Sequence, residues 1–160
     1  MEMEIRLAAK CTQDSITDGP GLRMVVWTQG CLHRCAGCHN PDTHSLAGGF
    51  AATVEEILAQ FDANPLLAGV TLSGGDPFVQ AQACAEIAKR VKARGKNVWT
   101  YTGYTLEQIL NSDRPDWLEL LNYTDVLVDG PYKEELRNQE LTFRGSENQR
   151  VIKVDEEVVA

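Results

Sequence analysis

Three short apolar runs recur at equal intervals between residues 69 and 129. Val70, Val98 and Val126 lie in these runs, each 28 residues from the next. This interval is long enough for one strand, one helix and two short loops. It therefore predicts successive βα units, whose strands lie parallel in one sheet and are joined by right-handed crossovers. We expect an α/β fold with a mostly parallel sheet.

The chain length limits how many such units can form. A complete barrel of eight βα units takes about 250 residues, whereas this chain has 160. We expect about five or six units in an incomplete TIM-like barrel or an open curved sheet, with one side left open to a partner. A hydrophobic content of 43% is enough for one core, so residues 1–160 are predicted to form a single domain.

Turn and capping signals set the boundaries of the expected elements. Four runs rich in β-branched and aromatic residues predict strands at 22–28, 69–72, 97–101 and 125–129. Capping-box patterns at 53–56 and 105–108 predict the starts of two helices. Asp76 and Pro77 predict the N-cap and first position of a third helix, which runs towards Gly95.

The charge balance argues against two classes of partner. The formal net charge is -8 and the isoelectric point is near 4.8. Because no block of Lys and Arg could neutralise phosphates, we expect no nucleic-acid partner and no anionic membrane surface. Residues 1–6 have neither a basic start nor an apolar run, so we expect no signal peptide or transmembrane helix, and the cytoplasm as compartment.

Three cysteines follow the first predicted strand: Cys31, Cys35 and Cys38, spaced Cys-x3-Cys-x2-Cys. In a reducing compartment such a cluster indicates metal binding or catalysis rather than disulfides. A structural zinc would need a closed set of four ligands, with a nearby histidine as the fourth. An iron–sulfur cluster on three thiolates leaves one iron open to bind a substrate. The spacing favours the cluster, and a zinc-stabilised binding module is the alternative.

A glycine-rich turn, Ser73-Gly74-Gly75-Asp76, follows the second predicted strand. Ligands of parallel sheets bind at the carboxyl ends of the strands. We therefore expect the cysteine segment, this turn and the run at 100–103 to converge on one rim. A strand-to-helix connection would by itself explain the turn, but beside the cysteine segment it indicates a ligand site.

These motifs together resemble the radical S-adenosylmethionine superfamily, and most closely the small activating enzymes of glycyl radical enzymes. The motifs are Asp18-Gly19-Pro20-Gly21-Leu22-Arg23, the run from Gln29 to Pro41, Ser73 to Pro77, Val128-Asp129-Gly130-Pro131, and Phe143-Arg144-Gly145-Ser146 with Asn148-Gln149-Arg150. They span nearly the whole chain. The last motif and the short length are similar to the family that activates anaerobic ribonucleoside-triphosphate reductase. Pyruvate formate-lyase activases share the first motifs but are longer.

The resemblance implies a [4Fe-4S] cluster on Cys31, Cys35 and Cys38, with S-adenosylmethionine bound to the open iron. It implies reductive cleavage of this cofactor to methionine and a 5′-deoxyadenosyl radical, which takes a hydrogen atom from a glycine Cα of the reductase. The protein would position the cofactor and exclude water and oxygen. The implied partners are the large glycyl radical subunit, anaerobic ribonucleotide reductase, and a low-potential electron donor such as flavodoxin.

The resemblance also implies cofactor contacts at six matching positions: Gly37, Cys38, His39, Gly74, Gly75 and Asp76. Glycine lets the backbone approach the cofactor closely, and Asp76 would place negative charge near its ammonium group. Gly37 departs from the superfamily pattern, in which an aromatic residue often precedes the third cysteine. Adenine stacking would then come from His39 or Tyr101.

Several assignments stay open at this point. An activase of the pyruvate formate-lyase type remains possible, as does a radical enzyme that acts on a small molecule in a more closed barrel. The 18–21 motif is either a simple turn or a brace for the cluster segment. Arg144, Asn148 and Arg150 could contact the partner, the cofactor carboxylate or the acidic surface. Cys84 is expected as a buried helical thiol, and Cys11 has no assigned role.

Overall fold

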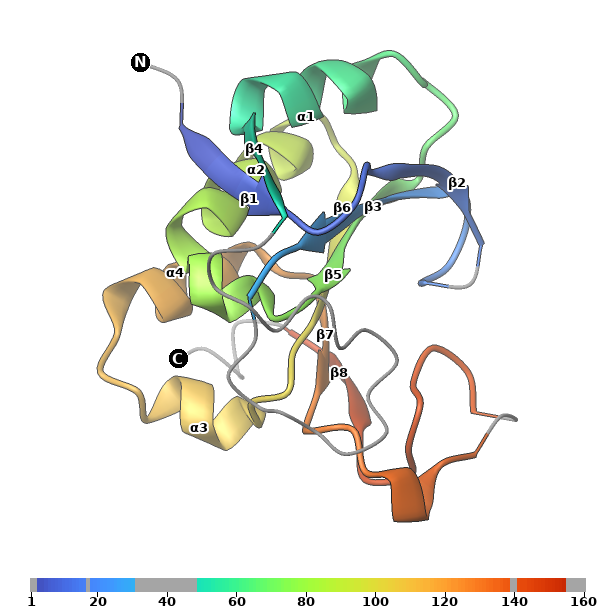
Figure 1. Cartoon of the computed structure of the whole chain (residues 1–160), viewed down its shortest axis with the longest axis vertical. Coiled ribbons are helices and arrows are strands. Elements are labelled where there is room, and N and C mark those ends of the chain that lie inside the picture. Colours follow the sequence, from blue (N-terminus) through green and yellow to red (C-terminus); the bar gives the residue numbers. More distant parts are fainter. Residues whose placement is uncertain (1–2, 17, 31–48, 139–140, 155–160) are drawn as a thin grey trace.

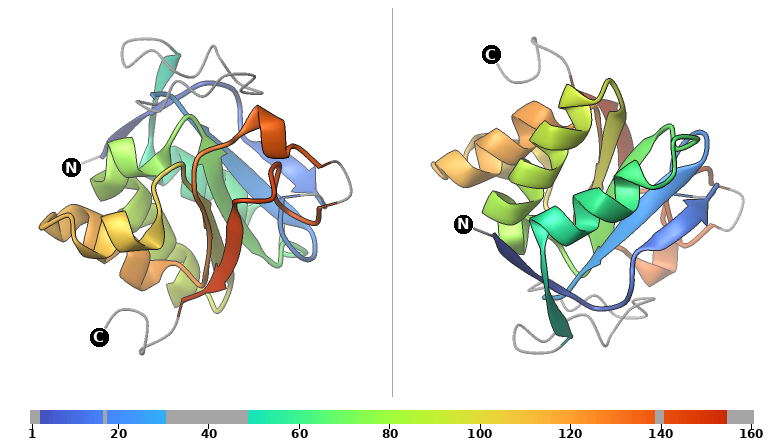
Figure 2. Two further views of the ribbon diagram at one scale, coloured as in Figure 1. Left: turned by 90° about the horizontal axis from the view of Figure 1, so that it is seen from below. Right: turned by 90° about the horizontal axis from the view of Figure 1, so that it is seen from above.

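The computed structural model of this chain describes residues 3–16, 18–30, 49–138 and 141–154. Within these residues eight strands form one sheet, and the helices gather on one side of it (Figures 1 and 2). The strands are β1 (Glu4–Leu7), β2 (Thr12–Ser15), β3 (Arg23–Thr28), β4 (Phe50–Thr53), β5 (Gly69–Gly74), β6 (Asn97–Tyr101), β7 (Val126–Asp129) and β8 (Arg150–Lys153). The helices are α1 (Val54–Asp62), α2 (Ala81–Ala93), α3 (Leu106–Leu110) and α4 (Pro115–Tyr123), with short 3-10 turns η2 (Pro77–Gln80) and η3 (Glu134–Leu136).

The centre of the sheet is parallel. Its order is β4-β1-β3-β5-β6-β7-β8, with β2 paired to β3 off this path. Strands β3, β5, β6 and β7 run parallel to one another, and β1, β2, β4 and β8 pair antiparallel at the flanks. The α/β fold is therefore confirmed, and the 28-residue interval correctly identified parallel strands.

The number of βα units is smaller than expected. In the described part of the chain, helices connect β3 to β5, β5 to β6 and β6 to β7, which gives three units instead of five or six. A parallel pair needs a crossover of a dozen or more residues. The links from β1 to β2 and from β2 to β3 are too short for one, so the chain forms antiparallel strands there instead.

The predicted starts of two helices agree with the structure, and the third agrees only in its N-cap. Thr53 caps α1 through its hydroxyl, and Thr105 forms the reciprocal capping box of α3. Asp76 is an N-cap as expected. However, Pro77 begins the 3-10 turn η2, and the α-helix starts only at Ala81.

The apolar core lies between the sheet and helices α1, α2 and α4. Alternate strand residues face the helices and are fully or almost fully buried: Met24, Val26, Val70, Leu72, Val98 and Leu127. Helix α2 lies between α1 and α4 and contacts both. Cys84 of α2 is buried in this core as predicted, and burial raises the pKa of its thiol.

The opposite face of the sheet is closed at its amino-terminal end by a buried arginine. Arg23 donates to Thr71 Oγ1 at 2.8 Å and to two backbone carbonyls, and its guanidinium lies 5.9 Å from the centre of the Trp99 ring. Burial lowers the pKa of Arg23 to about 10. Thr71 in turn donates to the carbonyl of Asp18 at 2.6 Å. The 18–21 turn therefore closes the end of β3 opposite to the one from which the cysteine segment leaves.

Candidate functional site

The turn after β5 contacts the end of β3. This agrees with the expectation that motifs at the carboxyl ends of neighbouring strands lie together on one rim of the sheet. The Gly75 amide donates to the Thr28 carbonyl at 2.8 Å, and the Asp76 amide donates to the Gly30 carbonyl at 2.7 Å. Gly30 is the last described residue before the 31–48 segment. Five expected site residues lie outside the described residues: Cys31, Cys35, Gly37, Cys38 and His39. The glycine-rich turn therefore lies against the residue that precedes the cysteine motif.

Both flanks of the cysteine segment are fixed at one corner of the sheet. Leu7 of β1 pairs with the end of β3 and with the start of β4. Gln80 accepts from the Arg6 amide at 2.8 Å and donates to the carbonyls of Arg6 at 2.8 Å and Gln29 at 2.9 Å. The Arg6 guanidinium donates to the Gly49 carbonyl at 3.0 Å. Gln80 could not be predicted from the sequence, because a side-chain amide that pairs with distant backbone leaves no spacing signal.

Asp76 joins the turn after β5 to the turn after β6. Its carboxylate is fully buried and accepts from the Phe78 amide at 3.0 Å, from the Thr102 hydroxyl at 2.8 and 2.9 Å, and from the Gly103 amide at 3.0 Å. Both carboxylate oxygens are thus bonded within the chain. Asp76 therefore positions the turns of the rim, and its contact with a cofactor ammonium stays a prediction.

The two glycines of the turn have different surroundings. Gly74 has a φ of +108°, and a Cβ atom there would lie 2.4 Å from both the amide nitrogen and the carbonyl oxygen of Thr28. Close packing of β5 against β3 therefore requires glycine at this position. Gly75 is half-buried and leads directly into Asp76. Its contact with a cofactor, like adenine stacking by the half-buried Tyr101, stays a prediction.

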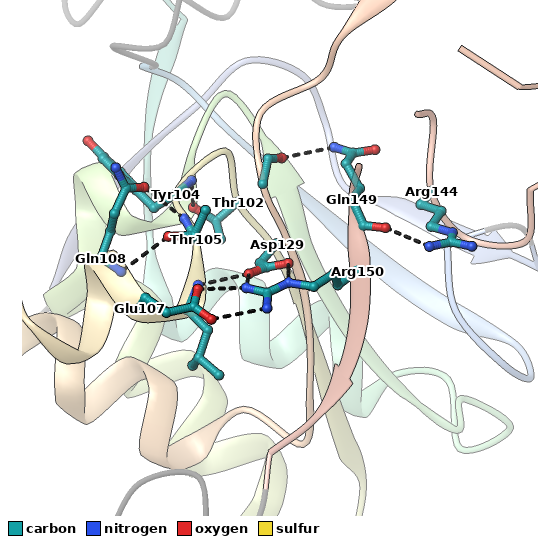
Figure 3. Close-up of polar contacts among 11 residues, drawn as sticks. Thr102, Tyr104, Thr105, Glu107, Gln108, Asp129, Arg144, Gln149 and Arg150 are labelled. Atoms are coloured by element: carbon teal, nitrogen blue, oxygen red, sulfur yellow. Dashed lines mark hydrogen bonds and ion pairs between the residues drawn. The ribbon is translucent and has the colours of Figure 1, made fainter. Parts of the chain in front are cut away.

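A second polar cluster lies at the carboxyl end of β7 (Figure 3). The buried Asp129 accepts from the Leu106 amide at 2.8 Å and from two nitrogens of Arg150, with Nε at 3.0 Å. Arg150 also donates to both carboxylate oxygens of Glu107, at 3.0 and 2.7 Å. Hydrogen bonds from Arg150 lower the pKa of Glu107 to about 2, and these carboxylates raise the pKa of Arg150. Arg150 is therefore used to hold β8 and α3 to β7.

Side chains also hold the segment that leads into β8. Asn148 donates to the Pro131 carbonyl at 2.8 Å and accepts from a serine hydroxyl at 2.7 Å. Gln149 accepts from the amides of Gly145 and Ser146 at 2.8 and 3.2 Å and donates to the Gly130 carbonyl at 3.1 Å. All three polar residues left open by the sequence thus have internal partners, and Arg144 donates to the Gln149 carbonyl at 2.6 Å.

The described residues do not themselves supply a metal centre. Within the described ranges no group of three or more His, Cys, Asp or Glu side chains could hold a metal ion. Cys11 and Cys84 are free thiols, and burial raises the pKa of Cys11 to about 11. Thiolates are the ligands that iron–sulfur clusters require. The three motif cysteines therefore fit a cluster, whereas the two other cysteines are poor ligands.

A family described as a 4Fe-4S single cluster domain matches residues 17–152. The match covers more than half of the chain and includes all three motif cysteines. The fold and the motif thus define an iron–sulfur protein.

Curated relatives narrow this class. Anaerobic ribonucleoside-triphosphate reductase-activating proteins are 38% identical over 140 residues in Enterobacteria phage T4 and 39% identical over 142 residues in Vibrio cholerae. The one from Escherichia coli (strain K12) is 36% identical over 145 residues. These alignments cover 84 to 85% of this chain and 85 to 91% of the relatives. The chain belongs to the family of anaerobic ribonucleoside-triphosphate reductase-activating proteins.

A solved structure supports the fold. QueE from Escherichia coli aligns with a TM-score of 0.50 and 18% sequence identity. The alignment covers 66% of this chain and 54% of QueE, so this chain matches about half of that structure.

Among the described helices, each is too short or too polar to cross a lipid bilayer.

Proposed function

We propose that this chain activates anaerobic ribonucleoside-triphosphate reductase by generating a glycyl radical on its large subunit. The observation that carries the proposal is the set of relatives with this name, which align with this chain over most of their length at 36 to 39% identity. The cysteine motif and the arrangement of the rim support it.

Three thiolates are proposed to hold a [4Fe-4S] cluster: Cys31, Cys35 and Cys38. S-adenosylmethionine would bind the open iron and contact Gly37, Cys38 and His39 from the cysteine segment, and Gly74, Gly75 and Asp76 from the turn after β5. When bound, the reduced cluster supplies the electron that cleaves the cofactor and starts hydrogen abstraction from glycine.

The residues of the rim would keep this site in shape. Asp76 bonds to both neighbouring turns, and Gln80 fixes the backbone before Cys31. These bonds preset the positions of the backbone groups that surround the cofactor. Glycine at position 75 leaves the backbone uncovered, so a ligand can approach it closely.

The remaining expectations complete the proposal. We infer that the sheet is part of an incomplete TIM-like barrel in a single domain. The side not covered by helices would admit the glycine-bearing segment of the reductase. A low-potential donor such as flavodoxin would reduce the cluster in the cytoplasm.

Electron paramagnetic resonance tests the proposal on protein reconstituted anaerobically with iron and sulfide. We expect a reduced [4Fe-4S] signal that changes on adding S-adenosylmethionine, and a glycyl radical signal after the reductase is added. Cys35→Ala should abolish both, whereas Cys11→Ser should keep both. A colourless protein that contains only zinc would overturn the proposal. Activation of pyruvate formate-lyase in place of the reductase would identify the other kind of activase.

A further inference from the structure

Arg144 is a half-buried cation without a carboxylate partner in the described part of the chain. One guanidinium nitrogen donates to the Gln149 carbonyl at 2.6 Å. In contrast, Arg150 bonds to Asp129 and Glu107, and three further arginines pair with surface carboxylates. A guanidinium carries five N–H donors. Against the described residues Arg144 therefore uses one of its five donors, and four remain for a ligand.

The backbone around Arg144 is firmly held. The preceding residue, Phe143, has a φ of +63°, and its ring packs edge-on against Trp99 with the ring centres 5.1 Å apart. A left-handed conformation costs a non-glycine residue about 1–2 kcal/mol, and it persists only where the surroundings enforce it. Gln149 binds the two amides that follow Arg144. The structure thus fixes Arg144 more tightly than an ordinary surface arginine.

Arg144 also lies close to the rim. Its hydrogen-bond acceptor, Gln149, directly precedes β8 and donates to the Gly130 carbonyl at the carboxyl end of β7. Figure 3 shows Arg144 on the side of Gln149 away from the cluster of Asp129, Arg150 and Glu107. The chain has a net charge of -8, so an anion that approaches the rim needs a local cation.

We propose that Arg144 binds a carboxylate at the rim. The planar fork of a guanidinium matches the two oxygens of a carboxylate, whereas an ammonium group offers only a point charge. This inference rests on the proposed function, which brings two sources of carboxylate to the rim. One is the methionyl carboxylate of S-adenosylmethionine, and the other is an acidic side chain of the reductase.

Two affinities distinguish these sources, both measured on the cluster-loaded protein without turnover. The first is the affinity for S-adenosylmethionine by equilibrium dialysis. The second is the affinity for the reductase in a binding assay at low and at raised salt. A charge-assisted hydrogen bond changes an affinity by about tenfold or more. We expect Arg144→Gln to lower one of these two affinities by about tenfold or more. Arg144→Lys should lower the same affinity by a smaller factor.

Arg137→Gln is the matched control, because Arg137 is exposed, lies between the same two strands and has no carboxylate partner in the described ranges. We expect it to change both affinities less than twofold. Unchanged melting temperatures of the variants exclude misfolding. If Arg144→Gln does not fold, Arg144→Lys replaces it in both binding assays, because lysine can keep the bond to Gln149.

A lower affinity for S-adenosylmethionine assigns the cofactor as the source, and a lower, salt-sensitive affinity for the reductase assigns the partner. If Arg144→Gln leaves both affinities within twofold, or Arg137→Gln lowers them equally, the inference is wrong. A wild-type protein that binds neither ligand would overturn the proposed function as well.

Discussion

Replacing Asp76 by asparagine separates a positioning role from a direct contact with the cofactor. In the structure both carboxylate oxygens of Asp76 accept hydrogen bonds, from the amides of Phe78 and Gly103 and from the Thr102 hydroxyl. Asparagine keeps one acceptor oxygen and replaces the other by an NH2 group. That group would then face an amide that also donates. One buried N–H of the rim therefore loses its partner.

The expected loss of stability follows from the one buried N–H that is left without a partner. An unsatisfied buried donor costs about 1–3 kcal/mol, and bonds to a charged acceptor are stronger than bonds to a neutral one. We expect Asp76→Asn to lower the free energy of unfolding by about 2–3 kcal/mol. Domains of this kind are stable by about 5–15 kcal/mol, so the variant should remain folded. Asp76→Ala removes all the acceptors and should cost more.

Urea unfolding of the cluster-free protein, followed by far-ultraviolet circular dichroism, measures this loss. Asp62→Asn is the control, because it makes the same chemical change at an exposed ion pair with Arg94, where we expect at most about 1 kcal/mol. A double-mutant cycle of Asp76→Asn with Thr102→Val should show clear coupling, since the two side chains are bonded.

Cofactor binding then distinguishes the two roles. If Asp76 acts by position, Asp76→Asn and Thr102→Val should both weaken S-adenosylmethionine binding to the cluster-loaded protein, because both disturb the same turn. If Asp76 contacts the ammonium group directly, only Asp76→Asn should do so. A loss of stability below about 0.5 kcal/mol, the usual range for a neutral surface substitution, would refute the positioning role.

Three further predictions concern residues around the rim. Gly74→Ala should lower the free energy of unfolding by more than about 2 kcal/mol, because it adds a backbone clash to the usual penalty of a positive φ. The control is Gly95→Ala, at φ +75° with nothing within 4 Å of the added atom, which should lower it by about 1–2 kcal/mol. Equal losses in thermal unfolding would contradict the packing argument. Gln80→Ala removes three hydrogen bonds to the backbone and should lower the free energy of unfolding in urea by about 2 kcal/mol. Gln82→Ala, at an exposed position, should change it by at most about 0.5 kcal/mol. A similar effect of the two would argue against a role of the Gln80 side chain in joining the backbone at Arg6 and Gln29. The pKa of Glu107 lies at about 2 instead of 4.5, so its ion pair stabilises the folded protein above pH 4.5 and loses this effect as the pH falls towards 2. In urea unfolding at several pH values, the free energy of unfolding of Glu107→Gln should fall less steeply with decreasing pH than that of the wild type. An identical dependence on pH would contradict the ion pair.

The parallel strands could be predicted from the sequence because they are buried on both faces and form continuous apolar runs. The flanking strands carry no such signal. Strand β2 has the polar sequence Thr-Gln-Asp-Ser, and most of β8 is exposed, so their pairing depends on the neighbouring strands. Helix α4 did carry a signal, with Pro115 at its first position and buried Trp117, Leu120 and Leu121 on one face. It was nevertheless not among the predicted elements.

The contacts of the site were harder to predict than its motifs. The sequence predicts Asp76 as an N-cap, which is a local contact between residues two positions apart. Its bonds to Thr102 and Gly103 join residues 26 and 27 positions apart, and no short-range pattern encodes them. The same holds for Arg150 and Glu107, which are 43 positions apart. Local motifs thus predict which residues matter, and the fold decides which of them meet.

Asp76 and Gln80 hold the rim together by side-chain bonds to the backbone rather than by apolar packing. The apolar core lies between the sheet and helices α1, α2 and α4. A site that receives both a cofactor and the backbone of a partner must expose its own backbone, yet keep it fixed. Glycine provides the exposed backbone, and buried polar side chains provide the rigidity. Substitutions at Gly75 should therefore change ligand access, whereas those at Asp76 and Gln80 should change the geometry of the rim.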